Sequence, residues 1–170
     1  MIIIGLNLSL AKIYTLSNNG LIATKTSGGD NWNCTIIGDQ EIPKNKISKW
    51  KIRINNFVLK SNTWNILIGI GPYNPNNECY FYKKCWTFIC GSSMLSIKSG
   101  SESNYNNNKG KLKKGDTIEV IVDRKNRNLS FSVNDSNYGN AYSQIPKDEI
   151  LYPIVMINDE NQIVELLNSI

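Results

Sequence analysis

Histidine is missing from this chain and cysteine is scarce, and these two shortages exclude most hydrolases and most metal sites. Ser-His and Cys-His nucleophile pairs both need an imidazole, so neither can be built, although lysine or carboxylate bases remain possible in principle. The cysteines form no Cys-x-x-Cys pair, so the usual structural zinc patterns are absent as well. Cys85 and Cys90 are five positions apart, which on a strand sends their side chains to opposite faces. We therefore expect reduced thiols, no bound metal and a cytoplasmic location. The cysteines of the chain are Cys34, Cys79, Cys85 and Cys90.

Long apolar runs are also missing. No stretch approaches the 18 or so apolar residues of a membrane helix, so we expect no membrane contact. The first eleven residues are apolar enough to resemble a signal peptide, but they lack the basic flank, and Asn7 and Ser9 interrupt the run. A first strand or a short packed segment is the favoured interpretation of these residues.

Residue patterns for catalysis are absent too. Gly69-Ile70-Gly71 lies within a strand-like run that no helix follows, so it is not a nucleotide-binding loop. A retaining glycosidase needs two carboxylates about 5 Å apart. Glu119 and Asp123 share a face of one predicted strand, but four positions separate them, which is roughly 13 Å. We expect no enzymatic activity and no cofactor.

The net charge of +5 and the pI of about 9.0 raise the hypothesis of nucleic-acid binding, which needs a concentrated basic face. In residues 49–54, basic side chains alternate with Trp50, Ile52 and Ile54, which indicates the solvated face of a strand. In residues 109–115, the lysines lie in a loop that leads into the next strand. Solvation accounts for both clusters, so we expect no specific nucleic acid; non-specific binding would show steep salt dependence.

What the chain does contain is a series of short strand-like runs separated by turn residues such as Ser17-Asn18-Asn19-Gly20. No 12-residue segment holds a clean helical stripe, so many short strands predict a two-sheet β-sandwich. The length suits one domain. Pro153 within a strand indicates an edge or a bulge. The predicted strands cover residues 12–16, 21–25, 33–37, 48–55, 64–71, 86–90, 94–98, 117–123, 129–133, 153–157 and 163–167.

Two neighbouring strands carry a recognisable motif. Residues 115–123 read Gly-Asp-x-Ile-x-Val-x-x-Asp, residues 129–134 read Leu-Ser-Phe-x-x-Asn, and Gly139-Asn140-Ala141 follows. This combination resembles the heart of a SPRY domain. Further matches occur in the expected order from about Trp32 to Leu167, at Trp50–Ile54, Ile66–Gly71, Cys85–Thr87 and Ile150–Val155.

The resemblance implies an all-β fold, a two-layer antiparallel β-sandwich of the SPRY, concanavalin-like type. Residues 1–170 then form a single SPRY-like domain, in which residues 1–31 are N-terminal strands or an extension packed on the sandwich. The motif residues themselves are best interpreted as fold determinants. Gly115-Asp116 forms a turn, Asp123 caps the following hairpin, and Trp86 and Phe131 belong in the core.

The resemblance also implies a non-catalytic module that binds a peptide or protein surface through loops at one edge. The loop positions carried over by alignment are Trp64, a tyrosine of the loop 73–82 and the segment 158–160. Family members that capture Asn-rich peptides have a Val-Trp-Gly-like segment where this chain has Asn-Asp-Glu. The predicted ligand-binding residues are therefore Trp64, Tyr73, Tyr80, Tyr82, Asn158, Asp159 and Glu160.

Alternatives remain for several of these residues and for the function. Tyr80 and Tyr82 alternate with Phe81 and so fit a strand that covers the core, and Trp64 fits a core or rim position. A lectin-like carbohydrate-binding domain is the alternative function, because lectins share this sandwich. The expected partner is a protein or peptide that binds a monomeric adaptor, with a ubiquitin-ligase or signalling assembly acting in trans.

Overall fold

The computed structural model describes residues 13–29, 32, 35–58, 64–73, 85–97, 101–105 and 110–167. Within these ranges the chain forms thirteen strands in two antiparallel sheets. The same ranges contain no helix that could cross a membrane. The predicted site residues Tyr80 and Tyr82, the cysteines Cys34 and Cys79, and the N-terminal residues 1–12 lie outside the described part.

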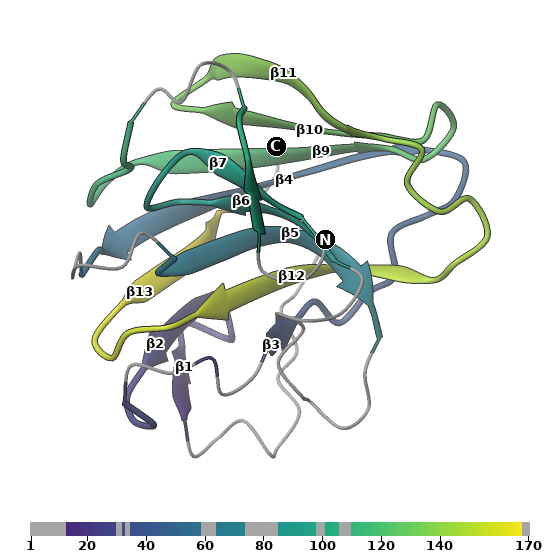
Figure 1. Ribbon diagram of the computed structural model, residues 1–170. Helices are drawn as coiled ribbons and strands as arrows, with labels where there is room; N and C mark the ends of the chain where they lie inside the picture. The colour runs from purple at the N-terminus through teal and green to yellow at the C-terminus, as the bar shows by residue number, and fades with distance from the viewer. Residues whose placement is uncertain are drawn as a thin grey trace.

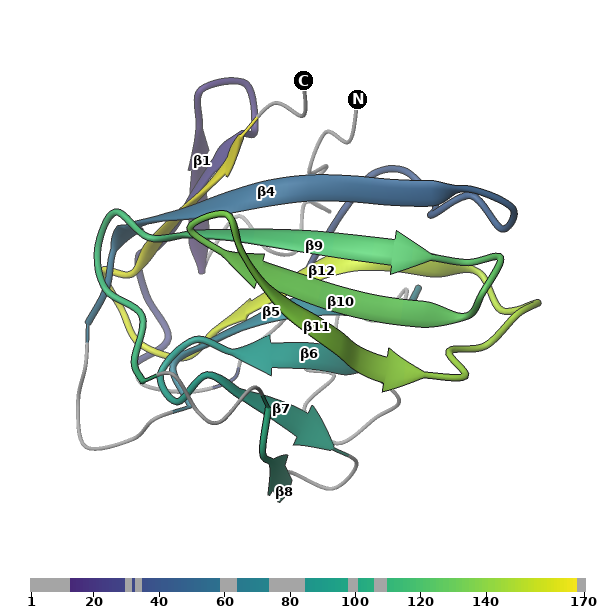
Figure 2. The ribbon, with the colours of Figure 1, turned by 90° about the horizontal axis from the view of Figure 1, so that it is seen from above.

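The two sheets stack as the layers of a sandwich (Figures 1 and 2). The first sheet has the order β1-β2-β13-β4-β9-β10-β11 and the second has the order β3-β12-β5-β6-β7-β8. The first comprises β1 (Tyr14–Ser17), β2 (Ile22–Lys25), β13 (Ile163–Leu167), β4 (Ile47–Asn56), β9 (Thr117–Asp123), β10 (Asn128–Val133) and β11 (Ser136–Ser143). The second comprises β3 (Thr35–Ile37), β12 (Leu151–Ile157), β5 (Ile66–Pro72), β6 (Trp86–Ile89), β7 (Met94–Ile97) and β8 (Ser101–Ser103). The all-β sandwich is therefore confirmed.

Alternation along β4 explains the first basic cluster. Trp50, Ile52 and Ile54 are buried between the sheets, whereas Lys49 and Arg53 are exposed on the outer face. Lys51 shares that outer face, where it pairs across the strands with Glu119. The outer face of the first sheet is thus solvated and mixed in charge, as the alternation predicts.

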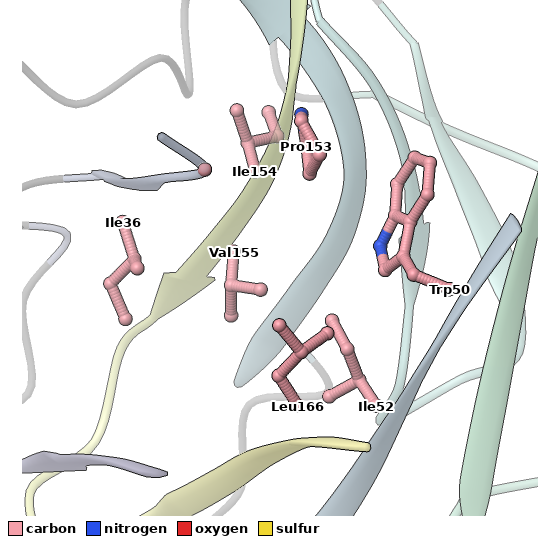
Figure 3. A pocket seen from close by; sticks show the side chains of 8 residues that line it. Ile36, Trp50, Ile52, Pro153, Ile154, Val155 and Leu166 are labelled. Atoms are coloured by element: carbon pink, nitrogen blue, oxygen red, sulfur yellow. The ribbon is translucent and has the colours of Figure 1, made fainter. Parts of the chain in front are cut away.

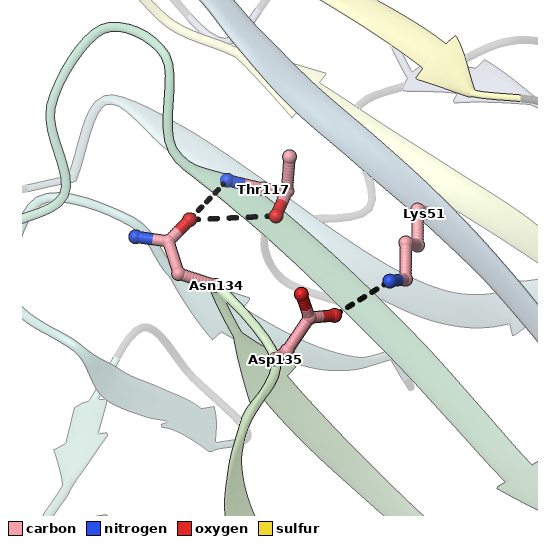
Figure 4. Close-up of polar contacts among 4 residues, drawn as sticks. All are labelled: Lys51, Thr117, Asn134 and Asp135. Atoms are coloured by element: carbon pink, nitrogen blue, oxygen red, sulfur yellow. Dashed lines mark hydrogen bonds and ion pairs between the residues drawn. The ribbon is translucent and has the colours of Figure 1, made fainter.

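Polar side chains of the motif fix the turns around β9 and β10. Asn134 Nδ2 donates to Asp116 Oδ1 at 2.9 Å, and Asp116 Oδ2 accepts from the Lys113 amide at 2.8 Å. Asn134 Oδ1 in turn accepts from the Thr117 amide at 2.9 Å, and next to it Lys51 forms an ion pair with Asp135 (Figure 4). The motif carboxylate and amide hold each other and fix the turn that leads into β9, which agrees with their interpretation as structural residues.

Two expectations about single residues need correction. Trp86 is half-buried and packs on the core from its margin, whereas Phe131 is fully buried as expected. Pro153 does not lie on an edge strand, because β12 has β3 on one side and β5 on the other. The carbonyl of Pro153 accepts from the Gly38 amide at 2.9 Å, just past the last residue of β3. The proline therefore lacks its N–H at a point where the short strand β3 has already ended, so few hydrogen bonds between β3 and β12 are lost.

Candidate functional site

The predicted site residues fall at opposite ends of the sandwich. Strands β5 and β12 are antiparallel, and Ile66 pairs with Ile157 at one end while Pro72 pairs with Leu151 at the other. Trp64 precedes β5 and Asn158–Glu160 follow β12, so these residues share one end. Tyr73 follows β5 and lies at the other end, about 20 Å away along a seven-residue strand.

We call these regions the Trp64 end and the Tyr73 end. The Trp64 end consists of residues 26–29, 32, 57–58, 64–65 and 158–162, and the Tyr73 end of residues 72–73, 124–127 and 144–150. In Figure 1 the Trp64 end lies where the β12 arrow points, beside the turn into β13. The Tyr73 end lies on the opposite side, beside the hairpin that joins β9 and β10.

A buried polar network lies beneath the Trp64 end. Lys25 Nζ donates to the Asn158 carbonyl at 2.5 Å, and Gln162 Nε2 donates to Asp159 Oδ2 at 2.6 Å. The side chain of Asn65 accepts from the amide of the next residue at 2.8 Å. Burying polar groups is costly unless they are hydrogen-bonded, so such a network specifies one arrangement of the loops. The five residues Lys25, Asn65, Asn158, Asp159 and Gln162 are each 6% exposed or less.

Backbone groups extend this network across three loops. The Asn158 amide donates to the Asn65 carbonyl at 2.8 Å, which joins the β12–β13 turn to the start of β5. The Asn161 amide donates to the Lys25 carbonyl at 2.9 Å, which joins the same turn to the end of β2. Asn56 Nδ2 donates to the Asn161 carbonyl at 2.6 Å, which adds the end of β4. The described ends of these three loops are therefore joined to one another by hydrogen bonds.

This network changes the interpretation of the segment 158–160. Asn158 and Asp159 are predicted as ligand contacts, but the structure places their side chains in the interior, 6% and 3% exposed. Glu160 is half-buried at the surface, where its Oε1 accepts from the Gly29 amide at 2.7 Å. Of the three residues, only Glu160 offers side-chain surface to a ligand.

Two tryptophans lie beside this unit. Trp64 and Trp32 are both half-buried, and both pack on one apolar cluster made by the second sheet. Sequence reasoning named Trp64 but not Trp32 as a site residue. The sequence signal for Trp32 was its place in the glycine- and asparagine-rich connection between β2 and β3. A large aromatic residue in a polar loop is typical of a contact with a partner.

The Tyr73 end is a separate surface. Tyr73 is 55% exposed, and its ring lies 5.7 Å from that of Tyr152, with the planes tilted by 53°. Ile150, next to the start of β12, is 49% exposed. Buried hydrogen bonds also occur at this end, where Arg124 donates to two carbonyls of the loop that leads into β12. Exposed aromatic and aliphatic side chains therefore lie beside an ordered loop.

Between the sheets lies a small apolar cavity lined by Ile36, Gly38, Trp50, Ile52, Pro153, Ile154, Val155 and Leu166 (Figure 3). The volume that the centre of a water molecule can occupy is about 10 Å³, so the cavity has room for about one water. The buried indole N–H of Trp50 has no hydrogen-bond acceptor among the described residues, and Figure 3 shows it turned toward Pro153 and Val155. The cavity is too small for a substrate. No three Asp, Glu or Cys side chains of the described part converge as a metal site would require.

Comparison with known proteins agrees with this geometry. The SPRY domain family model matches residues 55–168. The crystal structure of the SPRY domain of human HERC1 is 20% identical, with a TM-score of 0.68 over 92% of each chain. A crystal structure of a human SPRY domain is 14% identical, with a TM-score of 0.68 over 93% of this chain and 97% of that one. The Drosophila melanogaster neuralized NHR1 domain is 11% identical, with a TM-score of 0.60 over 92% of each chain. No curated protein sequence matches this chain.

Proposed function

Because this chain belongs to the SPRY domain family, we propose that it is a non-catalytic module that binds a peptide or protein surface through the Trp64 end. SPRY domains are in general protein-interaction modules. The observation that carries the proposal is the set of three loops joined by the buried network around Lys25 and Asp159. Loops that are already ordered lose little conformational entropy on binding, which favours affinity.

The side chains at this end suit protein recognition. Trp32 and Trp64 are anchored on the apolar cluster yet keep part of their surface exposed. Tryptophan is enriched among the residues that dominate binding energies, because it offers a large contact area with few rotatable bonds. Glu160 adds a carboxylate at the same surface. The expected ligand is therefore a segment with an apolar anchor and a nearby basic or hydrogen-bond-donating group.

We also propose a domain extent, a cellular location and partners for this chain. We place residues 1–170 in one domain that acts in the cytoplasm as a monomeric adaptor. Its partners include a ubiquitin-ligase or signalling assembly in trans.

Affinity purification from extract of the native cell tests the binding surface. The bait is the intact chain beside Trp64→Ala, with Tyr73→Ala as the matched control, since both replace one aromatic residue at opposite ends. Circular dichroism and thermal unfolding first establish that each variant is folded. We expect Trp64→Ala to retain at least about tenfold less of a partner protein than the intact chain does. Tyr73→Ala should retain as much of it as the intact chain.

Two other outcomes would contradict the proposal. If Tyr73→Ala lost the partner and Trp64→Ala kept it, the binding surface would be the Tyr73 end. If no protein were retained but a glycan array bound the chain, the domain would be a lectin-like binder instead.

A further inference from the structure

The small cavity between the sheets contains a buried hydrogen-bond donor that no protein group satisfies. Its walls come from strands β3, β4, β12 and β13, and from Gly38 just past β3. Trp50 is 2% exposed, and its indole N–H has no acceptor among the described residues. Figure 3 shows the indole nitrogen turned toward Pro153 and Val155, which line the cavity from the opposite sheet. A buried indole N–H usually has a hydrogen-bond partner, so this one needs a partner from outside the chain.

The carbonyl of Gly38 is the matching acceptor on the second sheet. Ile37 pairs with Ile154, so the next antiparallel pair is Gly38 with Pro153. Alternate pairs of an antiparallel ladder exchange two N–H···O bonds, and here the Gly38 amide donates to the Pro153 carbonyl at 2.9 Å. The return bond to the Gly38 carbonyl cannot form, because proline has no N–H. Gly38 is buried, and no other hydrogen bond to its carbonyl is found among the described residues.

No side chain of the cavity can satisfy these two groups. Apart from Gly38 and Trp50, the lining consists of aliphatic residues and one proline, namely Ile36, Ile52, Pro153, Ile154, Val155 and Leu166. Nearly all buried polar groups in proteins are paired with the chain or with ordered water, because an unpaired one loses its hydration without compensation. The missing partner is therefore a small molecule that both accepts and donates a hydrogen bond.

The volume of the cavity identifies this molecule. The space suffices for about one water and for no larger polar molecule. The oxygen of a water accepts from an N–H, and each of its hydrogens can be donated to a carbonyl. Two such bonds meet the minimum that buried waters in proteins have.

We propose that one ordered water occupies this cavity, where it accepts from Trp50 Nε1 and donates to the Gly38 carbonyl. The water takes the place of the N–H that Pro153 lacks, and it joins β4 of the first sheet to β3 and β12 of the second. This site accounts for two features together. A proline is tolerated inside a strand with neighbours on both sides, and the aromatic residue that faces it is a tryptophan, which can donate, and not a phenylalanine.

Water–protein NMR on the intact, nitrogen-15-labelled chain tests the site without any substitution. The chain has four tryptophans, so the indole N–H of Trp50 can be resolved and assigned. We expect this N–H to show a rotating-frame cross-peak to water with the sign of a dipolar contact. A missing cross-peak would overturn the proposal. So would a cross-peak with the sign of proton exchange, because the N–H would then be open to bulk solvent.

Two matched variants test whether the water lies in this cavity. Val155→Ile adds one carbon to the cavity wall and should expel the water, so the Trp50 cross-peak is lost. Val164→Ile adds the same group to a core residue that does not line the cavity, and the cross-peak should remain. Thermal unfolding first establishes that both variants are folded. Equal cross-peaks in the two variants would overturn the proposal.

A high-resolution crystal structure of the intact chain tests the bridge itself. We expect one ordered water within hydrogen-bond distance of both Trp50 Nε1 and the Gly38 carbonyl oxygen. A dry cavity would overturn the proposal. A water that contacts Trp50 but not Gly38 would also overturn it, because the carbonyl would then still lack the partner that Pro153 cannot supply.

Discussion

Asp159 and Glu160 are neighbours in the chain, yet they serve different purposes. Asp159 is 3% exposed and accepts the hydrogen bond of Gln162, whereas Glu160 is half-buried at the surface. Burial therefore separates two carboxylates of like chemistry, one that supports the loop from the interior and one that reaches the surface.

This difference predicts unequal effects on stability. Asp159→Ala removes the nearer of two acceptors of the buried Gln162 amide and leaves it only the Val58 carbonyl at 3.3 Å, so we expect the free energy of unfolding to fall by about 2 kcal/mol. Glu160→Ala removes a hydrogen bond that water can replace, so the expected loss is about 0.5 kcal/mol or less. Urea denaturation of both variants measures the difference. Equal losses would show that Asp159 does not support the loops.

Tyr105 makes stability depend on alkaline pH. Burial raises the pKa of its phenol to about 12 from an ordinary 10.0, and its hydroxyl donates to the Gly139 carbonyl at 2.7 Å. Since the folded pKa is the higher one, its contribution is complete below pH 10 and is lost as the pH rises toward 12. We expect Tyr105→Phe to lose less stability than the intact protein over that range in urea denaturation. Tyr73→Phe changes an exposed tyrosine and is the control, so its free energy of unfolding should fall with pH as steeply as that of the intact protein. An equally steep fall in Tyr105→Phe would contradict the role of Tyr105.

The burial of Asn158 and Asp159 could not be predicted from the sequence. Both are polar residues in a turn, and such residues are usually exposed. Their surroundings come from residues distant in the sequence, such as Lys25, which donates to the Asn158 carbonyl from 133 positions away. The family resemblance named Trp64 and Glu160 together with Tyr73 as residues of one edge, and the structure places Trp64 and Glu160, both half-buried, at one end of the sandwich and Tyr73 at the other.

Among the secondary-structure elements, the β9–β10 hairpin clamps the loop that leads into β12. Arg124, 1% exposed, donates from Nη2 to the carbonyls of Lys147 and Glu149, both at 2.8 Å. Arg127 donates from Nε to the Ile145 carbonyl at 3.0 Å. Asp123 caps the same turn through the Asn126 amide at 2.9 Å, as the motif predicts. One hairpin thus orders a whole loop of the Tyr73 end.

We expect loss of this clamp to loosen the loop. Arg124→Met removes two charge-assisted hydrogen bonds to the carbonyls of Lys147 and Glu149, which should cost about 3 kcal/mol. In native-state hydrogen exchange, amides of residues 144–150 should then exchange faster than in the intact protein. Lys125→Met, at the exposed neighbouring position, is the control and should change neither quantity. Unchanged exchange in Arg124→Met would contradict the clamp.

Strands with a clear apolar alternation could be predicted from the sequence, and those without it could not. Residues 117–123 and 163–167 form β9 and β13 with the predicted bounds. β8 and β11 were missed, because both are edge strands and β11 has the sequence Ser-Asn-Tyr-Gly-Asn-Ala-Tyr-Ser, which alternates poorly. β11 owes its place to pairing with β10 across two register shifts, and no local pattern encodes such pairing.

Taken as one body, the sandwich has unlike outer surfaces. The first sheet exposes a mixed-charge face, and the second carries an apolar face that is buried. Buried hydrogen bonds occur at both ends, from Lys25 and Gln162 at one and from Arg124 at the other. The exposed side chains differ, because tryptophans packed on the second sheet lie at the Trp64 end, whereas a tyrosine and an isoleucine are exposed at the Tyr73 end.

Hydrogen–deuterium exchange of the chain, alone and with the protein retained in the affinity purification, tests the binding surface most directly. Our account predicts slower exchange in residues 26–29, 64–65 and 158–162 on binding, with residues 72–73 and 144–150 unchanged. Protection confined to residues 72–73 and 144–150, with none at the Trp64 end, would contradict it.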